Sequence, residues 1–216
     1  MDDLQLQSIW NAYDKKLEKS LQLNIKLFES LQTDKAKSKL NALLSVKIIG
    51  IVLGILWVLF LGVLVYGTGF KNLYFTVSAG AILVFSAVGI ATYIKHISLI
   101  NQIDYTGSIT NTQQKLAALQ VSTINITRFL WLQMPFYTTF FWSPEWAASS
   151  DFGFWFIAVP ITLIFTLAAL WLYKNISTEN LHKAWMKKFM MMGVEYKYIL
   201  VASNLLQEIA DFKQGG

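Results

Sequence analysis

The chain has 216 residues, of which 55% are hydrophobic and only 14% are charged, with 18 basic and 13 acidic residues and a formal net charge of +5. Roughly one residue in four is charged in a soluble domain, so this composition is typical of a membrane protein. The absence of cysteine from the sequence excludes disulfides, thiolate catalysis, iron–sulfur clusters and cysteine-ligated zinc sites.

Residues 1–47 predict a cytoplasmic amphipathic helix. Apolar side chains recur there at helical spacing and form one stripe: Leu6, Trp10, Tyr13, Leu17, Leu21, Phe28 and Leu31. We take Trp10, Tyr13 and Leu17 as candidates for binding a protein partner. Since neither proline nor glycine lies between residues 31 and 48, this helix is expected to continue into the first membrane span.

The first two predicted spans are residues 48–66 and 73–94, and neither contains a charged residue. Nineteen helical residues cover about 28 Å, close to the thickness of the hydrocarbon core of a bilayer. The short connection between the spans requires a tight antiparallel hairpin. Within the first span, Gly50 and Gly54 form a close-packing motif, and we expect them to contact another helix of the same chain rather than a second copy.

Residues 95–127 predict a cytoplasmic helical hairpin that prolongs the second and third spans, with its turn near residues 104–108. The third span, residues 124–142, is the least regular, because it contains Gln133 and Pro135 and places Arg128 near one interface. The fourth span is predicted over residues 152–173.

The orientation of the spans follows from the positions of lysine and arginine. Eight basic residues precede the first span, three lie in or beside the 95–127 connection, and six follow residue 173, whereas the other two connections hold only Lys71. Basic residues concentrate on the cytoplasmic side. We therefore expect both termini and the central hairpin to be cytoplasmic, in a multi-pass protein of the bacterial inner membrane.

The C-terminal segment, residues 174–216, also predicts a cytoplasmic amphipathic helix. Trp185, Phe189 and Met192 lie on its apolar stripe and are further candidates for partner binding. The fold class is therefore all-α, with four transmembrane helices and cytoplasmic extensions formed by the N-terminal helix, the central hairpin and the C-terminal helix. These extensions bury their stripes either against one another or against a partner.

Three segments carry a resemblance to a known group of proteins. The segments "SIWNAYDKKLEKSLQLN" with "KAKSKLNALL" and "LINQIDYTGSITNTQQKLAALQ" resemble uncharacterised four-span membrane proteins of Gram-negative bacteria. The likeness covers most of the chain, and it implies the same four-span topology. Some of these proteins are encoded beside regulators of transcription, which implies a signalling role but gives no catalytic residue.

The sequence offers no recognisable catalytic, cofactor or metal site, so we expect neither enzymatic activity nor a cofactor. Its two histidines, His96 and His182, have no ligand at metal-binding spacing. The leading hypothesis is a scaffold that binds a cytoplasmic protein through its amphipathic helices, in contact with membrane lipid and not with nucleic acid. The alternative is a small oligomeric channel or transport component with polar residues along its pore: Ser78, Ser86, Thr138 and Thr139. Homo-oligomerisation is left open by both hypotheses.

Overall fold

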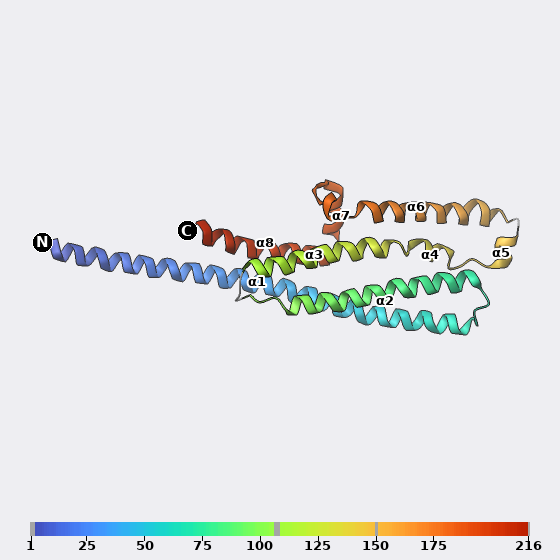
Figure 1. Ribbon diagram of the computed structural model, residues 1–216, viewed down its shortest axis with the longest axis horizontal. Coiled ribbons are helices and arrows are strands. Elements are labelled where there is room, and N and C mark those ends of the chain that lie inside the picture. The colour runs from blue at the N-terminus through green and yellow to red at the C-terminus, as the bar shows by residue number, and fades with distance from the viewer. Residues whose placement is uncertain (1–2, 106–108, 150, 216) are drawn as a thin grey trace.

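The computed structural model describes residues 3–105, 109–149 and 151–215. The secondary structure of this part of the chain is helical throughout, which confirms the all-α fold class (Figure 1). The α-helices are α1 (Asp3–Gly67), α2 (Leu73–Asn101), α3 (Ile109–Trp131), α4 (Met134–Thr139), α5 (Pro144–Ala148), α6 (Val159–Asn175), α7 (Ala184–Met192) and α8 (Val194–Gly215). A π-helical turn, Phe154–Ala158, leads into α6, and a 3-10 turn, Thr178–His182, precedes α7.

Helix α1 is a single helix of 65 residues, about 98 Å long. It unites the predicted N-terminal helix with the predicted first span, and its first glycine is Gly50. Its N-terminal part projects beyond every other element, past the C-terminal end of α8 (Figure 1). One long helix therefore runs from the projecting tip to the opposite end of the molecule.

Helices α1 and α2 form a tight hairpin. The turn between them uses positive φ angles at Gly69 and Phe70, and the Asn72 side chain caps α2 by accepting a hydrogen bond from the Phe75 backbone N–H at 3.2 Å. Gly50 and Gly54 lie where α1 contacts α2. A Cβ atom added at Gly50 would lie 2.7 Å from the Tyr93 ring, so only glycine allows this approach of the two helices.

Within the described residues, three helices are long and apolar enough to cross a membrane, and they lie in the stretches Ile9–Gly67, Leu73–Asn101 and Phe154–Asn175. The predicted third span, residues 124–142, is shared between the end of α3 and the short helix α4. The helix of this predicted span is interrupted because Pro135 has no backbone N–H to donate within a continuous helix. Pro135 lies instead in the first turn of α4. Helix α4 packs between α2 and α6.

The C-terminal segment forms two helices where the sequence predicted one. Gly193 separates α7 from α8 with an extended backbone (φ −75°, ψ 119°), and its N–H donates to the Met190 carbonyl at 3.0 Å. A Cβ atom at Gly193 would lie 3.2 Å from that same carbonyl oxygen, so glycine suits the bend. The chain therefore turns between the helices, and α8 runs back along α1 and α3.

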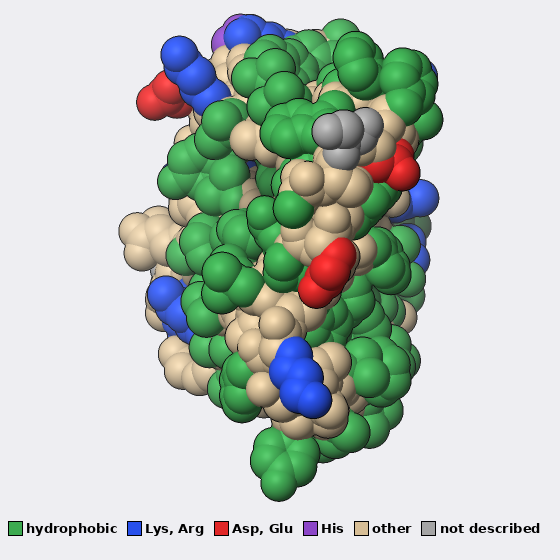
Figure 2. Space-filling view, turned by 90° about the vertical axis from the view of Figure 1, so that its right-hand side faces the viewer, with side chains coloured by type: hydrophobic (Ala, Val, Ile, Leu, Met, Phe, Trp, Pro, Cys, Tyr) green, Lys and Arg blue, Asp and Glu red, His purple; other side chains and the backbone are tan. Residues whose placement is uncertain are grey.

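The main hydrophobic core joins α8 to α1, α3 and the C-terminal end of α2. Its buried residues are Ala36, Leu40, Leu43, Ile100, Ile103, Leu116, Leu119, Ile199, Ala202, Leu206 and Ile209. Residues 106–108 of the predicted hairpin turn lie outside the described residues, but the flanking helices α2 and α3 both enter this core. The opposite end of the molecule, seen in Figure 2, is covered mostly by hydrophobic side chains with isolated charged ones.

Candidate functional site

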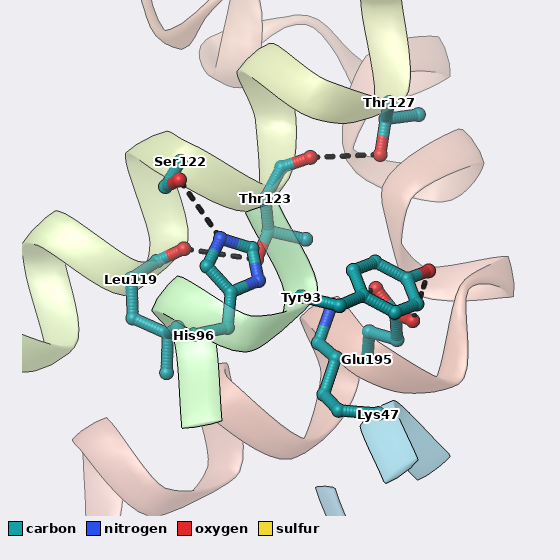
Figure 3. Close-up of polar contacts among 8 residues, drawn as sticks. All are labelled: Lys47, Tyr93, His96, Leu119, Ser122, Thr123, Thr127 and Glu195. Carbon is teal, nitrogen blue, oxygen red and sulfur yellow. Dashed lines mark hydrogen bonds and ion pairs between the residues drawn. The ribbon is translucent and has the colours of Figure 1, made fainter. Parts of the chain in front are cut away.

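A buried polar cluster joins α1, α2 and α8 at the level where the first predicted span begins. The Lys47 ammonium lies 2.6 Å from Oε2 of Glu195 and 3.9 Å from the centre of the Tyr93 ring. The Tyr93 hydroxyl donates to Oε1 of the same carboxylate at 2.7 Å (Figure 3). One carboxylate thus holds a cation and a hydroxyl that come from two other helices.

Lys47 is fully buried, whereas the Glu195 side chain keeps 21% of its surface exposed. Lys47 immediately precedes the predicted first span. Burial lowers the pKa of its ammonium, and the attraction and hydrogen bond of Glu195 oppose that change. The contact of 2.6 Å and the aromatic ring beneath the ammonium both favour the charged form. The ion pair between Lys47 and Glu195 therefore holds α8 against the α1–α2 hairpin.

His96 lies beside this cluster and two residues beyond the predicted second span. It is fully buried, and its Nε2 lies 2.8 Å from the Ser122 hydroxyl, while Nδ1 has no hydrogen-bond partner among the described residues. Burial, helped by the positive charges of Lys47 and Lys95, lowers the pKa of His96 to about 4. The imidazole is therefore neutral at pH 7 and links α2 to α3.

The polar cluster has the geometry of a structural contact rather than of a reaction centre. Both carboxylate oxygens of Glu195 accept hydrogen bonds, Oε2 from the Lys47 ammonium and Oε1 from the Tyr93 hydroxyl. The nearby hydroxyls of Thr123 and Thr127 donate to carbonyls of their own helix (Figure 3). In the described ranges no three histidine, aspartate or glutamate side chains gather as metal ligands would. The cluster therefore couples α1, α2 and α8 through one carboxylate.

A cavity of about 310 Å³ opens next to the cluster, between α3 and the α7–α8 bend. It is lined by Thr123, Thr127, Trp131, Phe189, Met190, Met192, Gly193, Glu195 and Tyr196. Two of the predicted partner-binding residues are in this lining. The Phe189 ring packs against Trp131 with ring centres 6.0 Å apart, whereas 70% of the Met192 surface is exposed. Trp185 lies outside the cavity and packs against Trp171 at 5.3 Å.

The other predicted partner-binding residues lie on the projecting part of α1. Trp10, Tyr13 and Leu17 expose 64%, 69% and 71% of their surface. Farther along the same helix, Leu27 and Leu31 are also more than half exposed. We call these five residues the N-terminal stripe. The structure does not bring the stripe together with Trp185, Phe189 and Met192, so the predicted residues form two separate surfaces.

The pairing of Lys47 with Glu195, which lie 148 positions apart, was not predicted from the sequence. Two signals in the sequence point to it in retrospect. Lys47 directly precedes an uncharged span, and Glu195 follows a run of methionines and a glycine. A charge at the edge of an apolar segment requires a partner when the segment is packed.

No family model, curated protein or solved structure matches this chain.

Proposed function

We propose that the protein is a non-enzymatic interaction scaffold of the bacterial inner membrane. Its four spans anchor a cytoplasmic helical bundle, and the N-terminal stripe on the projecting part of α1 binds a protein. The observation that carries this proposal is the exposure of Trp10, Tyr13 and Leu17 on the part of α1 that projects beyond the other described elements. Such an apolar patch marks a site of association.

In the proposed topology the α3–α4 segment crosses the membrane as the third span. The even number of spans agrees with the basic residues at both ends of the chain, and the resemblance to four-span proteins supports the same topology. The contacts of α4 with α2 and α6 support this topology, because neighbouring helices can satisfy the backbone groups that an interrupted span leaves free.

A labelling experiment with a membrane-impermeant maleimide tests this topology. The natural chain has no cysteine, so the exposed residues Glu145 and Ala117 can each be replaced in a full-length single-cysteine variant. Four spans predict labelling of Glu145→Cys in intact spheroplasts and of Ala117→Cys only after permeabilisation. If the α3–α4 segment does not cross, both variants require permeabilisation, and the four-span proposal fails.

The channel alternative receives less support from the contacts of its proposed pore residues. The Ser78 and Thr139 hydroxyls lie 2.8 Å apart, and the Thr162 hydroxyl donates to that of Thr138 at 2.9 Å. These contacts join α2 to α4 and α4 to α6 within one chain. Hydroxyls paired in this way hold helices together in lipid. We therefore retain the scaffold as the proposed function.

Site-specific photocrosslinking in living cells tests the scaffold proposal. A photoreactive residue replaces Leu17 in the full-length protein, and the control carries it at Gln22, which is exposed on the opposite side of the same helix. We expect a protein adduct from position 17 and none from position 22. The absence of an adduct at position 17, or equal adducts at both positions, would contradict the proposal.

A further inference from the structure

The N-terminal stripe is part of a longer seam with the spacing of a coiled coil. From Trp10 to Leu31 the spacing alternates between three and four residues, and the seven positions are Trp10, Tyr13, Leu17, Ser20, Asn24, Leu27 and Leu31. All seven are exposed, and none is charged. A seam of this kind requires a second helix to bury it.

Helix α8 already occupies a different face of α1. The Phe28 and Phe212 rings lie 4.7 Å apart, and the Gln32 side chain donates to Glu208 at 2.7 Å. Consecutive residues of a helix point about 100° apart, so Leu27 and Leu31 face away from this contact. They remain 58% and 52% exposed, although the next position along the helix is packed in each case. The seam and α8 therefore do not compete for space.

The same side of α1 stays open beyond Leu31, as far as residue 59. Asp34 is the next heptad position after Leu31, and the seven heptad positions that follow it are all exposed. They are Ser38, Asn41, Ser45, Ile48, Val52, Ile55 and Leu59. Neither α2 nor α8 covers this side. A second long helix can therefore approach the seam and continue beside α1 into the membrane without meeting the body of the protein.

The two polar positions of the seam, Ser20 and Asn24, favour a second copy of α1 over a wholly apolar helix as its partner. Two copies in one membrane have the same orientation, so their α1 helices can pair only in parallel, with each residue opposite its equivalent. Ser20 then faces Ser20, and Asn24 faces Asn24. A wholly apolar partner would leave both side chains without hydrogen bonds. A single asparagine at such a position is the device that fixes register and a two-stranded state in parallel coiled coils.

The projecting part of α1 also needs an external source of stability. Every residue from 9 to 24 is exposed, so this part of α1 lacks the tertiary packing that supplies most of the stability of helices in proteins. Pairing with an identical helix buries the large apolar side chains of Trp10, Tyr13 and Leu17 at once. The segment thus becomes stable at the same step in which the complex forms.

We infer that the N-terminal seam, from Trp10 to Leu31, pairs with the seam of a second copy as a parallel two-stranded coiled coil. This inference rests on the proposed function, because it names the protein that the N-terminal stripe binds. The scaffold is then a dimer held together outside the membrane, with the two bundles on either side of the coiled coil.

Disulfide formation in native membranes tests the inference, since every cysteine in the experiment is an introduced one. Full-length Leu17→Cys places a thiol on the seam, and full-length Gln22→Cys places one on the opposite side. After mild oxidation we expect Leu17→Cys to run at twice the 24.6 kDa mass of the chain and Gln22→Cys to remain monomeric. Coexpression of two differently tagged copies identifies the product as a homodimer.

The outcomes separate the inference from the proposed function. A monomeric Leu17→Cys variant, or equal dimer formation by both variants, overturns the inference. If photocrosslinking at position 17 then yields an adduct with a different protein, the scaffold proposal stands with another partner. If it yields no adduct, both fail.

Discussion

Replacing Glu195 by leucine removes the carboxylate that pairs with Lys47 in the buried cluster. The ammonium of Lys47 is fully buried, so it loses its partner in a site with little water. Breaking a buried ion pair from one side costs about 3–5 kcal/mol. Because 21% of the Glu195 side chain is exposed, water can reach the vacated position, and we expect a loss of about 3 kcal/mol. For a chain of this size that lowers the midpoint of thermal unfolding by roughly 6–12 °C.

The assay is thermal unfolding of the full-length protein in detergent micelles, followed by circular dichroism. Hydrogen exchange of α8 amides supplies a second readout, because the cluster ties α8 to the α1–α2 hairpin. The double variant Lys47→Met/Glu195→Leu removes both charges, so it should regain the part of the loss that comes from the unpaired ammonium, while the Tyr93 hydroxyl still lacks its acceptor. An unchanged midpoint for Glu195→Leu, or a double variant less stable than the single one, would refute the reasoning.

Three further predictions use the same unfolding assay. Gly50→Leu forces α1 away from Tyr93 and should cost about 1–3 kcal/mol, whereas Gly62→Leu, at a glycine with open space around it, should have little effect; equal losses would contradict the assigned contact. Asn72→Ala removes the cap of α2 and should cost about 1 kcal/mol, and an unchanged midpoint would argue against the cap. The lowered pKa of His96, about 4 against 6.5 when unfolded, means that the unfolded chain binds the proton more readily. The free energy of unfolding should therefore fall as the pH drops from about 6.5 to about 4, and His96→Gln should lessen that dependence. An unchanged pH dependence in His96→Gln would mean that another group causes it.

The sequence predicts the long elements of this fold well because their patterns are local. An uninterrupted run of helix-forming residues before Gly50 predicts that α1 continues from the N-terminal segment into the first span. The interruption before α4 is also signalled locally, by Pro135. Local patterns gave no reliable limit for the C-terminal helix, since one residue, Gly193, turns the chain without changing the spacing of apolar residues around it.

The candidate site was less predictable, because it depends on packing between distant segments. Periodicity places Phe189 and Met192 on one apolar stripe, but only tertiary contacts decide that Phe189 packs on Trp131 while Met192 remains exposed. The pairing of Lys47 with Glu195 likewise has no local signature beyond two charges beside apolar segments. The exposure of Trp10, Tyr13 and Leu17 follows from the length of α1, which extends past the end of α8. Leu27 and Leu31 are exposed because α8 packs on another face of α1.

The central claim is that the N-terminal stripe is buried in a complex in the native membrane. The rate at which a soluble maleimide modifies the full-length Leu17→Cys variant in permeabilised cells, compared with Gln22→Cys, tests it most directly. Both positions are exposed in the isolated chain, so detergent-separated monomers should react at equal rates. We predict that modification of Leu17→Cys is at least tenfold slower in the membrane and that the difference disappears on separation. Equal rates in the membrane would contradict the claim.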